Sequence, residues 1–240
     1  MSDLAISIRD VSKSFKKQKV LENIDLDIES GTYFGLIGVN GAGKSTLIKG
    51  ILDFISIDTG EIKLFDLPHT DRRSRERLCF LPEKFLAPYY LVGEEFLRYM
   101  ANLRGQEYDA AAAIEMLEVL DLEKAALSKP VRKYSKGMAQ KLGLAACLLS
   151  GRKLFILDEP MSGLDPKARA WLKRHLLELK TQGRTLFFST HMLADIQTLC
   201  DKVAILHEGV IRFIGSPGDC CEQFGADSFE QAYLRCVGAE

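Results

Sequence analysis

The sequence has almost no charge imbalance and no long apolar segment. Its 32 lysines and arginines nearly cancel its 33 aspartates and glutamates, giving a formal net charge of −1. Composition therefore offers no reason to expect nucleic acid as a partner. No apolar run approaches the ~20 residues that span a bilayer, and Met1-Ser2-Asp3-Leu4 lacks the basic start of a signal peptide. We expect a soluble, cytosolic chain, which does not exclude a membrane partner.

Cysteine pairs and internal repeats are also missing. None of the six cysteines forms a C-x-x-C pair, and Cys220 directly precedes Cys221, a spacing that does not suit zinc. Reduced and mostly buried thiols are therefore expected. The chain is long enough to bury a sizeable core and has no low-complexity segment, so we expect one compact α/β domain with a helical insertion.

The apolar pattern divides the chain into three parts. Residues before about 80 alternate as half-buried strands around one helix. Residues from about 84 to 150 follow helix patterns, with Asp109 as an N-cap. Later strands are apolar throughout, as strands buried on both faces are, and Ser228 opens a last short helix with a capping-box spacing. The expected strands are 5–11, 24–28, 61–65, 154–157, 185–189, 203–206 and 210–214.

The most specific signal lies at residues 38–46, which read Gly-Val-Asn-Gly-Ala-Gly-Lys-Ser-Thr. The run lies between a strand-like and a helix-like segment, the setting that a phosphate-binding loop requires. Glycines allow positive φ and let successive N–H groups face an anion, and the following helix adds positive partial charge. A glycine-rich turn with an exposed lysine is the alternative, which this context disfavours. A nucleoside triphosphate is therefore the first candidate ligand.

The residues of this loop have distinct expected roles. Lys44 would reach the β- and γ-phosphates, the Ser45 hydroxyl would bind Mg²⁺, and Thr46 would assist at the α- and β-phosphates. The other nucleotide-binding positions of the loop are Gly38, Asn40, Gly41 and Gly43.

Two carboxylates follow the apolar strand at 154–157. In an open α/β sheet, ligands bind at the carboxyl ends of the strands. Asp158 is expected to hold Mg²⁺, directly or through water. Glu159 is expected to accept a proton from the water that attacks the γ-phosphate. A strand that ends in solvated acids is the alternative, and the upstream phosphate loop makes it less favoured.

Three further motifs complete the pattern. Tyr-Ser-Lys-Gly-Met at 134–138 precedes an apolar helix, Ser-Gly-Leu-Asp at 162–165 follows the acids, and His191 ends a strand. In this order and spacing the chain resembles the nucleotide-binding subunit of an ABC transporter, over about residues 4–216. The resemblance implies an α/β P-loop NTPase (RecA-like) core with an N-terminal antiparallel β subdomain and an inserted α-helical subdomain.

The resemblance also implies domain limits. Residues 1–216 would form the ATPase domain, with the helical subdomain inserted at about 84–150. Residues 217–240 would form a short C-terminal helical extension.

Individual roles follow from the same resemblance. Phe15 matches the aromatic residue that stacks on adenine, although a phenylalanine at a strand end is often a core residue. Ser135 and Gly137 match signature residues that bind the γ-phosphate held by the opposite subunit; for Ser135 a plain helix cap is the alternative. Asp165 matches the D-loop aspartate that joins the subunits, a role compatible with an N-cap. His191 matches the switch histidine that hydrogen-bonds the γ-phosphate.

Two motifs depart from the usual family pattern. The signature usually reads Leu-Ser-Gly-Gly-Gln, and here Tyr134, Lys136 and Met138 replace three of its residues. Glu83 stands where glutamine is usual. Its carboxylate could contact Mg²⁺ or the attacking water, but it would also add negative charge near the γ-phosphate. With the ending at 229–235, these features resemble the bacterial ABC-2-type exporters.

The function implied by the resemblance is ATP binding and hydrolysis, with Mg²⁺, that powers transport through permease subunits on a separate membrane-spanning chain. Two copies, or one copy and a related ATPase, would close head to tail on ATP. The chain would lie peripherally on the cytoplasmic face of the inner membrane. Residues 83–94, with Phe85, Tyr89 and Tyr90, are the expected docking surface, unless these aromatics pack under the helical insertion.

Other functions remain open at this stage. A non-transport ABC ATPase acting on nucleic acid or the ribosome would share the motifs, but the chain has one cassette and no coiled-coil or zinc insertion. A regulatory module that holds ATP without hydrolysing it is disfavoured by Asp158, Glu159 and His191. A small-molecule kinase would not need the element at 135–137. The transported substrate is not identified by the sequence.

Overall fold

The computed structural model describes residues 3–239. The expectation about a signal peptide concerns Met1 and Ser2, which lie outside the described residues, as does Glu240 at the end of the expected extension. Within residues 3–239, no helix combines the length and the apolarity needed to cross a membrane.

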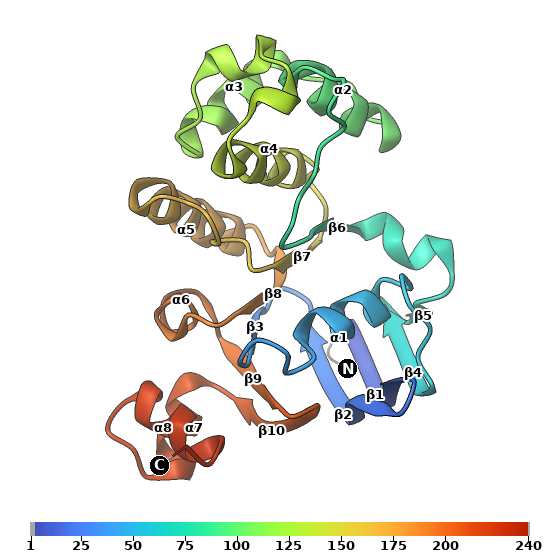
Figure 1. Cartoon of the computed structure of the whole chain (residues 1–240), viewed down its shortest axis with the longest axis vertical. Coiled ribbons are helices and arrows are strands. Elements are labelled where there is room, and N and C mark those ends of the chain that lie inside the picture. The colour runs from blue at the N-terminus through green and yellow to red at the C-terminus, as the bar shows by residue number, and fades with distance from the viewer. Residues whose placement is uncertain (1–2, 240) are drawn as a thin grey trace.

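Two β-sheets form the framework (Figure 1). The first is antiparallel, with the strand order β2-β1-β4-β5. The second has the order β10-β9-β3-β8-β7-β6, and its strands run parallel except in the β9–β10 hairpin. The strands are β1 Leu4–Phe15, β2 Gln18–Glu29, β3 Tyr33–Ile37, β4 Thr59–Leu64, β5 Leu67–Pro68, β6 Leu78–Leu81, β7 Leu154–Asp158, β8 Thr185–Thr190, β9 Lys202–His207 and β10 Val210–Gly215.

Figure 1 shows how the helices are arranged around the sheets. Helix α1 follows β3 directly, α2 to α4 gather at the top of the view, and α7 and α8 lie at its lower left, near the C-terminus. The α-helices are α1 Lys44–Ile51, α2 Gly93–Leu103, α3 Ala110–Val119, α4 Lys136–Leu148, α5 Pro166–Thr181, α6 Leu193–Leu199, α7 Pro217–Phe224 and α8 Phe229–Cys236. The 3₁₀ turns are η1 Arg72–Arg77, η2 Lys124–Ser128 and η3 Val131–Lys133.

The central strands β3, β7 and β8 are buried along their whole length. Their continuous apolar sequences suit a parallel sheet covered on both faces. The parallel register aligns Asp158 of β7 with Ser189 of β8, and Ile37 of β3 with Thr190 of β8. The sheet therefore brings the polar ends of three strands to one edge.

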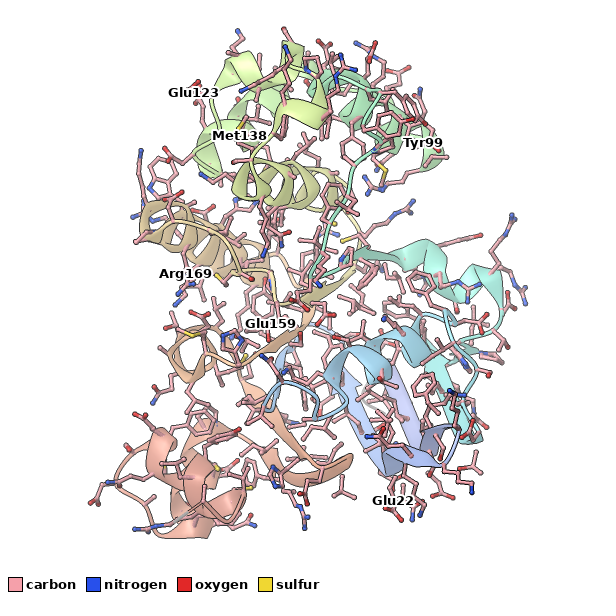
Figure 2. All side chains as sticks on the ribbon, in the orientation of Figure 1. Glu22, Tyr99, Glu123, Met138, Glu159 and Arg169 are labelled. Carbon is pink, nitrogen blue, oxygen red and sulfur yellow. The ribbon has the colours of Figure 1, made fainter. Side chains whose placement is uncertain are left out.

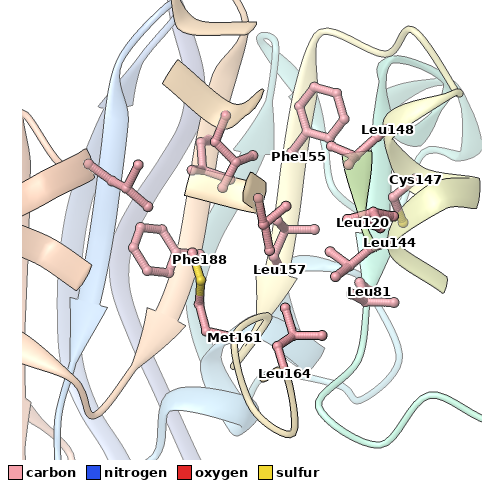
Figure 3. Packing of buried hydrophobic residues seen from close by; sticks show 14 of the residues in the cluster. Leu81, Leu120, Leu144, Cys147, Leu148, Phe155, Leu157, Met161, Leu164 and Phe188 are labelled. Carbon is pink, nitrogen blue, oxygen red and sulfur yellow. The ribbon is translucent and has the colours of Figure 1, made fainter. Parts of the chain in front are cut away.

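Two apolar clusters fill the interior. One lies between the two sheets and around α1. The other joins the parallel sheet to the helices: Leu144 and Leu148 of α4 face Phe155 and Leu157 of β7 (Figure 3). Burying one such side chain contributes about 1.5–3 kcal/mol. This packing holds the start of α4 in a defined place relative to the end of β7.

Most of the expected elements are confirmed. Every expected strand is present, and the Asp109 and Asp165 carboxylates cap α3 and α5 by accepting backbone N–H bonds. The expected α/β fold class with its two sheets and helical insertion is confirmed as well. The six cysteines are free, and three are buried while three are half-buried.

Some features differ from the expectation. Strands β5 and β6, of two and four residues, and helix α6, of seven, were not expected. Helix α7 lies within residues 217–240, where a helical extension was expected. At α8 the Ser228 hydroxyl accepts the N–H of Gln231. The Gln231 side chain accepts the N–H of Asp227 and not that of Ser228, so the expected capping box is only half formed. Helix α8 packs on the core through Phe229, which is fully buried. The domain boundary at 216 stays a prediction.

Candidate functional site

The loop between β3 and α1 has the backbone of an anion cradle. Gly43 caps α1 at φ +110°, and Gly41 has φ +87°, a region that side chains other than glycine rarely adopt. A Cβ on Gly43 would lie 2.9 Å from the carbonyl oxygen of Val20, whereas Gly41 faces open space. The loop thus turns sharply into a helix N-terminus and leaves room above it.

A cavity of about 480 Å³ opens above this loop. It unites loop residues with side chains from the ends of β6, β7 and β8. The predicted residues that line it are Asn40, Gly41, Gly43, Lys44, Ser45, Thr46, Glu83, Glu159 and His191. Val20 and Ser162, which the sequence did not single out, also line it.

Lys44 is buried at the floor of this first cavity. Its ammonium group donates to the carbonyl oxygens of Gly38, at 2.7 Å, and Val39, at 3.3 Å. Its Nζ lies 3.8 Å from Oε1 of Glu159. Gly38 therefore belongs to the site through its carbonyl oxygen, although it does not line the cavity. A buried ammonium held by backbone carbonyls is well placed to pair with an anionic ligand.

Glu159 faces both Lys44 and His191. Its Oε2 lies 3.0 Å from Nδ1 of His191, and because a carboxylate can only accept, this contact requires a proton on Nδ1. Its Oε1 is buried and has no hydrogen-bond partner. Figure 2 places Glu159 near the middle of the molecule, below the helical group. An acceptor without a donor, in a cavity beside a phosphate cradle, can take a proton from a bound water.

The metal predictions concern Ser45, Asp158 and Glu83. Asp158 is buried, and its Oδ1 accepts a hydrogen bond from Ser189. Within residues 3–239, no group of three or more histidine, cysteine, aspartate or glutamate side chains is arranged to hold a metal. One carboxylate and a hydroxyl fit Mg²⁺, which commonly takes few protein ligands and completes its shell with water and substrate phosphates.

A second cavity, of about 530 Å³, lies at the start of α4. Its lining includes Ser135, Gly137 and Asp165, three predicted residues that do not line the first cavity. The Ser135 hydroxyl caps α4 by accepting the N–H of Met138 at 3.2 Å, and the first turn carries no acidic residue. Figure 2 shows Met138 within the helical group, away from Glu159. Most of the predicted site residues are thus divided between two cavities, while Phe15, Gly38 and Asp158 line neither of them.

Lys141 links this second cavity to the loop before α5. Its buried ammonium donates to Asp165 Oδ2 at 3.0 Å and to the carbonyl oxygen of Asp121 at 2.8 Å. The N–H of Ala168 and the Lys141 ammonium lower the pKa of Asp165 to about 2. Asp165 is therefore a charged N-cap, in agreement with the cap interpretation. A helical spacing of four residues from Gly137 could have identified Lys141.

Phe15 ends β1 and is 47% exposed. The alternative that it is an ordinary core residue is therefore wrong. It does not line the first cavity, and its ring lies 5.4 Å from the Lys13 ammonium. An exposed ring of this kind can stack on a planar base, so stacking stays a prediction.

The aromatic residues of 83–94 differ in exposure. Tyr89 and Tyr90 are exposed and in edge contact with each other. Phe85 is half-buried and packs edge-on against Phe96 of α2, so for this residue the alternative, packing under the helical insertion, holds. The buried face of the amphipathic helix α2 covers it, which the sequence around Phe85 does not reveal.

The fold and the first cavity together define a P-loop nucleotide-binding protein. The profile of the ABC transporter family matches residues 21–162, more than half of the chain. The chain therefore belongs to the ABC transporter family.

Similar proteins agree with this assignment. An ABC transporter ATP-binding protein from Synechocystis is 39% identical over 92% of this chain and 62% of its own length. A Nod factor export ATP-binding protein I from Bradyrhizobium diazoefficiens is 34% identical over 90% of this chain and 72% of its own. The chain thus spans about three fifths of the length of the Synechocystis relative and of a similar Nostoc protein.

Solved structures show the same fold. The ATP-binding subunit of an ABC transporter matches with a TM-score of 0.88 and 32% identity, covering 97% of this chain and 99% of the other. A dimeric ATP-binding cassette in a post-hydrolysis state, bound to ADP and Pi, has a TM-score of 0.81 and 20% identity over 88% of this chain and 98% of its own. The second likeness concerns the fold alone.

Proposed function

We propose that this chain is the ATP-binding and ATP-hydrolysing subunit of a transporter. The observation that carries the proposal is the division of the predicted residues between two cavities of one chain. The first has the phosphate cradle and a carboxylate without a hydrogen-bond partner. The second has the capped N-terminus of α4, whose first turn carries no acidic residue. Neither cavity has all the groups expected around a triphosphate.

In the first cavity, Lys44 leaves the carbonyl oxygens of its own loop and pairs with the β- and γ-phosphates, with Thr46 assisting. Glu159 takes a proton from the water that attacks the γ-phosphorus, and the bond to the bridging oxygen breaks to leave ADP and phosphate. His191 donates to the γ-phosphate. Ser45 and Asp158 would hold Mg²⁺, which would neutralise charge at the phosphates.

Glu83 lines the first cavity and is exposed. Its proposed contact is with the metal or the attacking water. Because its carboxylate also repels the phosphate charge, its net effect on turnover is expected to be small compared with that of Glu159. Phe15 stacks on the adenine from the end of β1.

The second cavity completes the site of another copy. In a head-to-tail pair, the N–H groups at Ser135 and Gly137 of one chain meet the γ-phosphate held by Lys44 of the other. The nucleotide then links the two chains, and hydrolysis removes the link. The second chain is a copy of this one or a related ATPase.

A membrane partner is part of the proposal. The chain is proposed to lie on the cytoplasmic face of the inner membrane and to drive a permease on a separate chain, with the exposed Tyr89 and Tyr90 at the contact. Export is favoured by two relatives, the Nod factor export protein and the linearmycin resistance protein LnrL of Bacillus subtilis, which is 27% identical over 94% of this chain.

Mixing two inactive variants tests the composite site. Lys44→Ala disables the first cavity, and Ser135→Arg blocks the second, so each variant alone should lack Mg²⁺-dependent ATPase activity. In a mixed pair, one site combines the intact Lys44 of one chain with the intact Ser135 of the other. An equal mixture should recover about a quarter of the wild-type rate, since about half of the pairs are mixed and each has one intact site.

The control mixture combines Lys44→Ala with the double variant Lys44→Ala/Ser135→Arg, which leaves no intact site in any pair and should stay inactive. A first mixture as inactive as this control would contradict the composite site. A wild-type chain that binds ATP but does not hydrolyse it with Mg²⁺ would instead support a regulatory module.

A further inference from the structure

Ser189 contacts both acids at the end of β7. It is fully buried in β8, directly opposite Asp158 in the parallel register. Its hydroxyl donates to Oδ1 of Asp158 and accepts the N–H of Glu159 at 3.1 Å. A hydroxyl has one donor and two acceptor positions, so it can make both bonds at once.

The backbone of Glu159 needs this support. Glu159 has φ +49°, a left-handed conformation that disfavours residues other than glycine and persists only where the surroundings impose it. Its N–H is shared between the Ser189 hydroxyl and the Ser189 carbonyl oxygen, at 3.2 Å, and its own carbonyl oxygen accepts the N–H of Ser162 at 3.0 Å. This turn directs the Glu159 side chain toward Lys44 and His191.

We infer that Ser189 is a positioning residue that orients the Asp158 carboxylate and holds the strained turn of Glu159, so that the proposed metal ligand and the proposed base keep a fixed relation. The inference rests on the proposed function and adds a residue outside the predicted motifs. Ser189 does not line the first cavity. It acts through the two acids.

The test compares Ser189→Ala with Thr185→Val, a matched control. Thr185 is also a buried hydroxyl of β8, but it lies at the far end of the strand, where it accepts the N–H of Gly31 at 2.8 Å. Ser189→Ala should lower kcat about 10- to 100-fold, the loss that follows removal of a hydrogen bond to a charged group. Its Kd for ATP without Mg²⁺ should stay within about threefold of wild type, because Lys44 and the loop are unchanged.

A second readout does not depend on turnover. Hydrogen exchange of the Glu159 amide should become faster in Ser189→Ala but not in Thr185→Val, because only the first change removes an acceptor of that N–H. Ser189→Cys keeps the side-chain volume but is a weak donor, so it should behave like Ser189→Ala. Thermal unfolding identifies any variant that fails to fold.

The inference is wrong if kcat stays within about threefold of wild type in both Ser189 variants, if Thr185→Val loses as much, or if exchange at Glu159 is unchanged. A wild-type chain without ATPase activity would refute the proposed function, and the exchange measurement would still decide whether Ser189 holds the turn.

Discussion

The two cavities of this chain are built in different ways. The first lies at the edge of a parallel sheet, and its polar side chains stand at the ends of strands that are buried along their whole length. The second lies in front of α4, and some of its charged side chains pair with one another, as Lys141 does with Asp165 and Asp121. Among the described residues that line the two cavities, only Glu159 of the first has a buried carboxylate oxygen without a hydrogen-bond partner.

This difference suggests that the first cavity serves ATP hydrolysis and the second serves the pairing of two chains. A buried acceptor without a partner costs free energy, and a rigid sheet edge can hold such a group in place. In the second cavity the buried Lys141 ammonium is paired with Asp165, and the lining offers a capped helix N-terminus. We therefore expect substitutions in the first cavity to affect binding and turnover within each chain, and substitutions in the second to affect the pairing of chains.

The largest expected effect comes from Glu159→Gln, which breaks the chemistry of the first cavity alone. The amide cannot take a proton from water, so kcat should fall about 10²- to 10⁴-fold. ATP binding should persist and favour a stable pair of chains, which size-exclusion chromatography with ATP would detect. Glu83→Gln, in the same cavity, is the control and should change kcat less than about tenfold. Near-normal turnover by Glu159→Gln would contradict its role as the base.

The next largest effect is expected on nucleotide binding in the first cavity, not on the chemical step. Lys44→Ala should raise the Kd for ATP about 10- to 100-fold, because charge-assisted bonds to the phosphates are lost. Lys49→Ala changes an exposed lysine of the same helix and should leave the Kd unchanged. Fluorescent nucleotide titration measures both. Equal affinities for the two variants would count against Lys44 as a phosphate ligand.

A smaller effect is expected at the rim of the first cavity. Phe15→Ala should weaken ATP binding by up to about tenfold, since aromatic stacking contributes about 0.5–1.5 kcal/mol. Phe15→Tyr keeps a ring of the same shape and should bind ATP normally. Because a stack on the base is independent of the phosphates, the loss should be equal for ADP and ATP. A loss confined to ATP would contradict the stacking.

The smallest effect concerns the second cavity and depends on pH. Asp165 has its pKa lowered from 3.8 to about 2, so its carboxylate stabilises the fold above about pH 4, and this stabilisation disappears as the pH falls toward 2. Asp165→Asn should therefore be less stable than wild type at about pH 6, with a difference that shrinks at about pH 3. Urea unfolding at both pH values tests this. A stability difference between the two proteins that is the same at both pH values would show that the charge of Asp165 does not contribute to stability.

The sequence predicted the first cavity well because each of its motifs is a short run of residues with few alternative interpretations. The spacing of Lys44 and Ser45 after a strand, and of Asp158 and Glu159 at the end of another, leads directly to a shared sheet edge, as the lining of the cavity confirms for Lys44, Ser45 and Glu159. The fold class followed from the same strands and helices.

Tertiary contacts were less predictable. Ser189 pairs with Asp158 across two strands that are 31 residues apart in the chain, and only the sheet register brings them together. Phe85 looks exposed in its loop, yet Phe96 covers it. The Lys141 ammonium donates hydrogen bonds to Asp165 and Asp121, which lie on two other segments of the chain. These pairings depend on packing, which a single sequence does not specify locally.

The loop 162–165 has a thermodynamic consequence. Ser162 lines the first cavity, while Gly163 and Asp165 line the second, so one four-residue segment belongs to both. A ligand that shifts this segment in one cavity changes the affinity of the other, and linkage requires the same factor in the reverse direction. If two chains share their nucleotides as proposed, nucleotide binding at one composite site is therefore coupled to the nucleotide affinity of the other composite site. Two identical sites could then bind ATP with unequal affinities without any difference in sequence.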